Sequence, residues 1–339
     1  YVYKYTNETS SRVPASDWYY TTGGNMVGFK ARSVIGGYWM RVLMDDMYKK
    51  QPLKEWAPVE DGLSTRWASE VTPDNALPEY PRPLMERTEW QNLNGLWDYG
   101  FTASNAATAP KLFDGKILVP FPLESSLSGV KINMPDNNVM WYNRTFTLPE
   151  SWKDKNIIIN FGASDYATTV YVNGKSVATH TGGYASFSAD ITKNVVFDGE
   201  NTISVKVDDK TNADSSALGK QRKSGTGNGS IWHTSVSGIW QTVWLEPVNA
   251  KHITAVNSTS DIDNNTLTIT PAVENAANGD MVKVTVSYEG AAVAEKSVAA
   301  GSAATFEISD PHLWSPDSPS LYDVEVSLMS GSDVADNVK

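Results

Sequence analysis

The chain has 339 residues, of which 40% are hydrophobic and 20% charged, and its formal net charge is −11. Such a chain is long enough for two or three domains and too apolar for a disordered one. The acidic balance argues against a nucleic-acid partner, because phosphate binding needs a basic surface. No apolar run approaches the length of a membrane-spanning helix. With no cysteine, the sequence has no disulfide framework, thiolate nucleophile or thiolate zinc site.

The sequence predicts no metal or cofactor site. Its four histidines stand far apart, at positions 180, 233, 252 and 312. They therefore lack the i, i+4 spacing that places two imidazoles on one helix face. An acidic stretch, Asp261 to Asn265, weakly resembles a calcium loop but lacks the glycine and bidentate glutamate such a loop requires. We interpret it as a hairpin turn.

The first part of the chain has a helical pattern. Apolar residues recur at helical spacing between Val34 and Met47, which predicts one amphipathic helix. We expect residues 1–54 to be the helical tail of a truncated domain whose remainder preceded Tyr1. Prolines and polar residues then dominate residues 55–80, which we interpret as a linker that lies over the next domain.

From residue 81 onward the pattern changes to alternation with period two. Thr168 to Val172, followed by Asn173-Gly174, is a typical strand and hairpin turn. Further strands are expected at 157–161, 202–207, 242–245, 267–273, 282–288, 305–308 and 321–328. Short strands separated by turns indicate sandwiches. The predicted fold is mainly β, with a jelly roll over 81–248 and an immunoglobulin-like sandwich over 249–339.

Several motifs in this β region occur in a fixed order. They are Trp90-Gln-Asn-Leu-Asn-Gly-Leu-Trp97, Val119-Pro-Phe-Pro-Leu-Glu124, Trp141-Tyr-Asn-Arg-Thr-Phe146, Val172-Asn-Gly174, His180-Thr-Gly-Gly-Tyr184, Ser237-Gly-Ile-Trp240 and His312-Leu-Trp-Ser-Pro-Asp317. Together they resemble the N-terminal half of family 2 glycoside hydrolases, the family of β-galactosidases, β-glucuronidases and β-mannosidases. The resemblance covers roughly residues 63 to 330.

The resemblance implies a galactose-binding-like, sugar-binding jelly roll, an immunoglobulin-like domain and normally a TIM barrel. Both catalytic carboxylates of the family lie on the barrel, at the short separation that a retaining double displacement requires. No barrel pattern is present before Lys339, so we assign no catalytic residue and expect the missing barrel to be a partner of this chain. At the position of an Asp that helps β-galactosidases hold the sugar and a sodium ion, this chain has Ser230, so galactose specificity does not carry over.

The candidate carbohydrate-binding residues lie on loops. Trp232 follows the glycine-rich stretch from Ser224 to Gly229, which is typical of a functional loop, and an indole face packs well against a sugar ring. Trp240 and Trp244, at i and i+4 of one expected strand, are assigned to the core, and Asp165 to a strand end satisfied by backbone amides or solvent. The candidate binding residues are Trp232, His233, Ser230, Gln221, Asp136 and Asn137, although Asp136 and Asn137 also suit a polar turn.

A second, shorter resemblance concerns the beginning of the chain. Arg12 to Tyr19 and Val27 to Tyr38 are similar to the last hairpin of bacterial glutaminase-like (α/α) toroid proteins. The parent is then a bacterial, periplasmic or secreted fusion whose signal peptide lies outside this sequence. Two other hypotheses stay open: a carbohydrate-binding module attached to a glutaminase-like hydrolase, and a structural scaffold without ligand.

Overall fold

The computed structural model describes residues 18–20, 27–29, 55–60, 64–211, 219–223 and 231–339. Near the beginning of the chain, β1 (Trp18–Tyr20) pairs antiparallel with β2 (Val27–Phe29). The helix expected between residues 34 and 47 lies outside the described residues. So does Ser230.

The first large body is a sandwich of two antiparallel sheets. One sheet has the order β10-β9-β12-β6-β4-β5 and the other β11-β7-β16-β3. The strands of the first sheet are β4 (Gly95–Ala103), β5 (Gly115–Val119), β6 (Asn138–Phe146), β9 (Ala167–Val172), β10 (Lys175–Thr181) and β12 (Asn201–Asp208). The second contains β3 (Gln91–Asn92), β7 (Asn156–Phe161), β11 (Phe187–Asp190) and β16 (Val243–Val248).

Alternating sequence patterns explain this sandwich. In β12, every second side chain from Asn201 to Val207 is buried, while its neighbours remain partly exposed. Because successive side chains of a strand point to opposite faces, this pattern puts one face of the sheet on the core. The core contains the fully buried side chains Trp97, Tyr142 and Phe161. The jelly-roll fold predicted for this region is confirmed.

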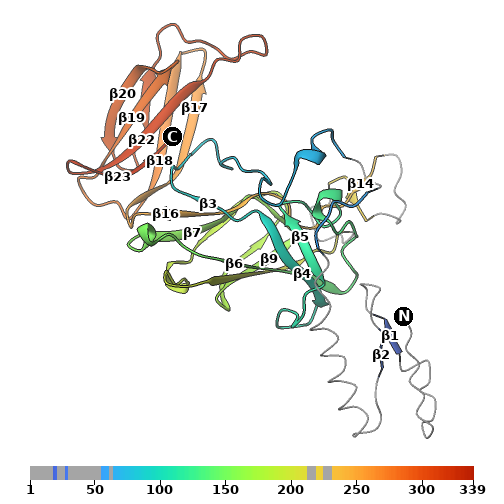
Figure 1. Ribbon diagram of the computed structural model, residues 1–339. Helices are drawn as coiled ribbons and strands as arrows, with labels where there is room; N and C mark the ends of the chain where they lie inside the picture. The colour runs from blue at the N-terminus through green and yellow to red at the C-terminus, as the bar shows by residue number, and fades with distance from the viewer. Residues whose placement is uncertain (1–17, 21–26, 30–54, 61–63, 212–218, 224–230) are drawn as a thin grey trace, which may run out of the picture.

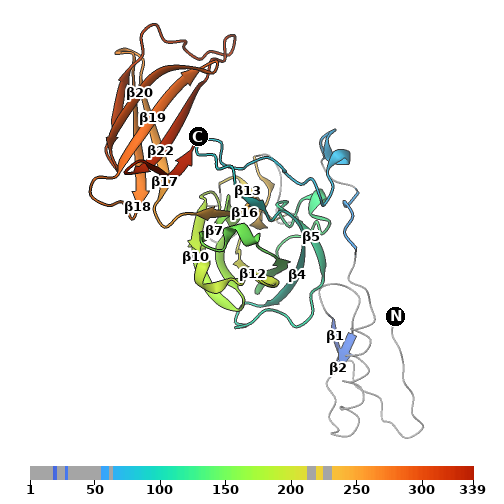
Figure 2. The same cartoon turned by 60° about the vertical axis from the view of Figure 1, so that its left-hand side comes forward.

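The second body is a smaller sandwich with its own core. A three-stranded sheet, β17-β18-β21, faces a four-stranded one, β20-β19-β22-β23 (Figure 2). The bounds are β17 (His252–Asp261), β18 (Thr266–Glu274), β19 (Met281–Tyr288), β20 (Ala291–Ala299), β21 (Ala304–Glu307), β22 (Tyr322–Ser330) and β23 (Asp333–Val338). Its core is separate from that of the jelly roll. The predicted immunoglobulin-like sandwich is confirmed.

Two turns follow the chemistry expected of them. Asn173 and Gly174 have φ of 48° and 75° and join β9 to β10, as a hairpin turn of this type requires. The Asp261 carboxylate accepts hydrogen bonds from the backbone N–H groups of Asp263 and Asn264, between β17 and β18. The acidic stretch is therefore a hairpin turn, as interpreted.

Part of the proline-rich segment packs on the jelly roll. The Trp56 indole N–H donates to the carbonyl of Leu127 at 3.0 Å, and the N–H of Val59 donates to the carbonyl of Ser126 at 3.0 Å. Gly129, at φ 79°, lies directly under the Trp56 ring, where a Cβ would collide with it. These contacts hold the segment against the short 3-10 helix η3 (Ser126–Ser128).

A buried arginine joins the two sandwiches. Arg87 donates two hydrogen bonds to the carboxylate of Asp336, at 2.7 and 2.9 Å, and a third to the carbonyl of Ile253. Its Nε lies 3.4 Å from Glu246 of the jelly roll. On the other side, Glu246 accepts from the Tyr80 hydroxyl at 2.6 Å and from Arg82. The junction is therefore a connected network of buried charges.

We predict that Arg87→Ala destabilises the chain far more than removal of an exposed pair. Leaving Asp336 and Glu246 buried without this cation costs about 3–5 kcal/mol. The matched control is Lys153→Ala, which breaks an exposed, solvent-screened pair with Glu150 and should lower stability far less. Urea unfolding followed by tryptophan fluorescence measures both. Equal losses would show that the junction network contributes nothing to stability.

Candidate functional site

The candidate site lies at the end of the jelly roll where β13 (Gln221–Arg222) and β14 (His233–Thr234) pair in parallel. In Figure 1, β14 lies at the side of the jelly roll away from the immunoglobulin-like sandwich. The Gln221 side chain links three segments here. Its Nε2 donates to Asp165 Oδ2 at 3.0 Å, and its Oε1 accepts from the N–H of Val236 at 2.8 Å.

Aromatic and basic side chains occupy the surface of this strand pair. The Arg222 guanidinium lies over the Trp232 ring, 4.4 Å from its centroid. His233 is exposed beside it. Tyr184 is 63% exposed and makes an edge contact with Trp240, whose indole N–H donates to the carbonyl of Gly183. Partly exposed aromatic rings with polar neighbours suit the apolar face and hydroxyl groups of a sugar.

A second loop is fastened to the first by an ion pair. Lys223 Nζ lies 2.7 Å from Asp136 Oδ1 and donates to the carbonyl of Met134 at 2.9 Å. The Lys223 hydrogen bond and charge hold the pKa of the Asp136 carboxyl below its usual range. Asn137 follows on the same turn, exposed and at φ 57°.

Beneath this surface lie three buried carboxyl groups. Glu124 accepts from the hydroxyls of Ser235 and Ser237 and from the Ser237 N–H. Burial raises the pKa of Glu124 to about 7 and that of Asp165 to about 6, and it raises the pKa of Asp209 as well. Asp209 contacts the hydroxyl of Ser237 at 2.5 Å and that of Thr211 at 2.9 Å.

The structure brings most of the predicted residues together. Gln221 and His233 pair across β13 and β14, Trp232 directly precedes β14, and Lys223 brings Asp136 to the strand pair. The parallel pairing of β13 with β14 was not predicted, because the two short strands lie apart in the sequence. One signal could have revealed the buried carboxyl groups. It is Glu124, at the end of the motif that begins at Val119, together with the serines at positions 235 and 237.

Two predictions about neighbouring residues are wrong. Trp240 and Trp244 do not share a strand, because Trp240 lies between β15 (Gly238–Ile239) and β16. Trp244 is buried, but Trp240 is only partly so. Asp165 is satisfied by the side-chain amide of Gln221, where backbone amides or solvent were expected.

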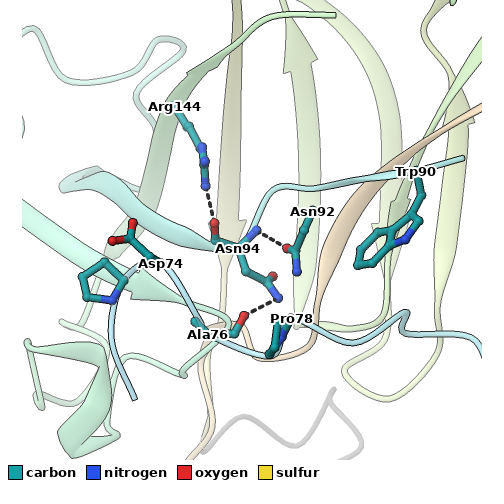
Figure 3. Close-up of a pocket in the computed structure, with 8 residues that line it drawn as sticks. Asp74, Ala76, Pro78, Trp90, Asn92, Asn94 and Arg144 are labelled. Atoms are coloured by element: carbon teal, nitrogen blue, oxygen red, sulfur yellow. Dashed lines mark hydrogen bonds between the residues drawn. The ribbon is translucent and has the colours of Figure 1, made fainter. Parts of the chain in front are cut away.

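A hollow of about 350 Å³ lies between the segment Pro73–Pro78 and the jelly roll (Figure 3). Arg144 and Asn94 line it, and both make hydrogen bonds within the domain. Arg144 donates to the carbonyls of Leu93 and Asn94, while the Asn94 amide donates to the carbonyls of Ala76 and Leu77. These contacts fasten the segment to the sandwich, so we assign the hollow to the structure of the domain.

Across the described part of the chain, no group of three or more His, Asp or Glu side chains is arranged to hold a metal ion. Over the same residues, no helix has the length and hydropathy of a membrane span.

The comparisons with known families agree with this geometry. Residues 116–247 match the family described as glycosyl hydrolases family 2, sugar binding domain, and residues 251–339 match glycosyl hydrolases family 2. The chain carries two domains of family 2. Residues 1–42 match the glutaminase A six helical-hairpin domain. The candidate loops all fall within the match to the sugar-binding domain.

Similar proteins are longer than this chain. A β-galactosidase of Thermoanaerobacter pseudethanolicus is 29% identical over 59% of this chain and 27% of its own length. A β-glucuronidase of Paenibacillus borealis is 24% identical over 74% of this chain and 44% of its own. A solved β-glucuronidase from Ruminococcus gnavus has a TM-score of 0.59 at 21% identity, covering 77% of this chain and 46% of that one. The matched part of this chain therefore spans less than half the length of each of these three proteins.

We predict that Lys223→Ala returns the pKa of Asp136 to its ordinary value. In the wild type the ammonium group favours the ionised carboxylate. Carboxyl-carbon NMR through a pH titration measures this directly. Lys153→Ala, whose lysine pairs with Glu150, should leave the Asp136 titration unchanged. An unaltered Asp136 titration in Lys223→Ala would show that the two loops are not paired in solution.

Proposed function

We propose that this chain is the sugar-binding accessory half of a family 2 glycoside hydrolase. In this proposal the jelly roll completes a substrate pocket, and the immunoglobulin-like sandwich positions a catalytic barrel encoded elsewhere in the parent. The parent hydrolyses O-glycosyl bonds by retaining double displacement. The observation that carries the proposal is the joining of two loops by Lys223 and Asp136, beside Trp232 and Gln221.

The geometry supports a saccharide better than a flat or apolar ligand. The Trp232 ring offers an aromatic face, while Gln221, His233 and Asp136 offer donors and acceptors around it. Carbohydrate sites combine these two features, because a sugar has apolar C–H faces and hydroxyl edges. The names of the relatives suggest the ligand class, a β-linked hexoside or hexuronoside.

The immunoglobulin-like sandwich supplies a surface for the barrel. Three large apolar side chains of one loop region are exposed: Leu313 at 55%, Trp314 at 60% and Leu321 at 74%. Such a group of apolar side chains is typical of a protein contact. Because the matched part of this chain covers less than half of these relatives, we assign this surface to the catalytic domain of the parent.

The match of residues 1–42 to a glutaminase A domain favours one alternative, a carbohydrate-binding module joined to a glutaminase-like hydrolase. The saccharide surface is the same in both proposals. They differ in whether the parent gene encodes a barrel after residue 339, which its sequence would decide. In either case we propose a periplasmic or secreted location.

We predict that saccharides bind at Trp232. Titrating methyl β-glucuronide and methyl β-galactoside should change tryptophan fluorescence in the wild type. Trp232→Ala should weaken binding roughly two- to tenfold, because about 0.5–1.5 kcal/mol of aromatic contact is lost. Trp67→Ala is the matched control, since Trp67 is also stacked by an arginine, Arg66, at 4.3 Å. Equal affinities in the three proteins would remove Trp232 from the site.

We also predict that this chain alone does not hydrolyse aryl β-glycosides. A retaining mechanism needs two carboxyl groups about 5 Å apart and open to the substrate, whereas Glu124, Asp165 and Asp209 are buried and hydrogen-bonded. Nitrophenol release by the purified chain, abolished by Glu124→Gln, would contradict this.

A further inference from the structure

One hydroxyl group lies between two buried carboxyl groups under the loop surface. Ser237 Oγ is 2.7 Å from Glu124 Oε1 and 2.5 Å from Asp209 Oδ2. Glu124 follows β5, Asp209 follows β12, and Ser237 precedes β15. Three segments distant in the sequence thus meet at a single oxygen atom.

If both carboxyl groups were ionised, the cluster would lack one proton for its hydrogen bonds. The Ser237 hydroxyl has one hydrogen and can donate to only one of the two carboxyl groups. Its contact with the other group is a hydrogen bond only when that group is itself protonated and donates to Ser237. The remaining donors do not resolve this, because Ser235 and Thr211 each donate to one carboxyl group. The cluster is therefore fully satisfied with one shared proton.

The charges around the cluster indicate which group holds the proton. Lys223 and Asp208 act on Asp209, and their effects on its pKa are opposite. Glu124 lies near the buried phenol of Tyr142, and burial is the main influence on the Glu124 pKa. Asp165 lies near enough to Asp209 for repulsion to raise the Asp165 pKa. Glu124, with its pKa raised by burial, is accordingly the main holder.

The cluster is directly attached to the strand pair that presents the candidate residues. The Ser237 N–H donates to Glu124, and the N–H of the preceding residue, Val236, donates to Gln221. We propose that Glu124 and Asp209 share one proton through Ser237, and that this proton fixes the β13–β14 pair that presents Gln221, Trp232 and His233. Glu124 and Ser237 are then positioning residues of a surface whose sugar-binding role rests on the proposed function.

The direction of the pH dependence follows. The pKa of Glu124 rises from its ordinary 4.5 to about 7 in the folded chain, so the folded state keeps a proton that the unfolded chain releases. This contribution to stability is complete below pH 4.5 and is lost as pH rises to about 7. Above that pH two carboxylates face one hydroxyl, their repulsion is unrelieved, and the strand pair loosens.

Hydrogen exchange on the full chain between pH 5.5 and 8.5 tests this, after correction for intrinsic exchange rates. Peptides covering residues 219–223 and 231–239 should lose protection about tenfold or more in the wild type between pH 5.5 and about 7, and the loss should level off above pH 7. Glu124→Gln, which is neutral at every pH, should show no such step, whereas the exposed Glu150→Gln should keep it. Identical pH profiles in the wild type and Glu124→Gln would overturn the proposal.

A second measurement covers the case in which Glu124→Gln does not fold. Carboxyl-carbon NMR of the wild type should show Glu124 titrating near pH 7, and a titration near pH 4.5 would overturn the shared proton. Saccharide affinity measured over the same pH range separates the two proposals. A chain that shows the exchange step and binds no saccharide supports the shared proton and contradicts the proposed function.

Discussion

A carboxylate removed from water must receive hydrogen-bond donors, and this constraint organises both ends of the jelly roll. At one end, Glu246 and Asp336 are satisfied by Arg87, Arg82 and Tyr80, which join the two sandwiches. At the other end, Glu124 and Asp209 are satisfied by hydroxyl groups and a shared proton. The first network joins its carboxylates directly to arginine guanidinium groups. The second depends on a proton that is lost near neutral pH.

This difference suits the two ends to different tasks. The junction must hold two bodies in one arrangement, and a multiply bonded guanidinium does so because its planar geometry restricts the partner. The loop end presents side chains to a ligand, and its segments are linked by few buried apolar contacts. Local stability there depends on individual hydrogen bonds, such as those of Gln221, so a single proton affects it strongly.

Much of the fold was predictable from the sequence, because alternation and turn chemistry are local. A few consecutive residues are enough to predict the strand β12 and the turn at Asn173. The site was only partly predictable. Trp232 and Gln221 stood out beside a glycine-rich stretch, but the Lys223–Asp136 pair joins residues 87 positions apart. The roles of Glu124 and Ser237 depend on contacts between three segments that are distant in the sequence, so no local sequence pattern could predict them.

The central claim is that the β13–β14 surface binds a saccharide. A crystal structure of this chain with methyl β-glucuronide at saturating concentration tests it most directly. The account predicts a pyranoside ring against Trp232, with its hydroxyl groups contacting Gln221, His233 or Asp136. A sugar bound in the hollow between Trp90 and Arg144, or an empty β13–β14 surface at saturation, would contradict it.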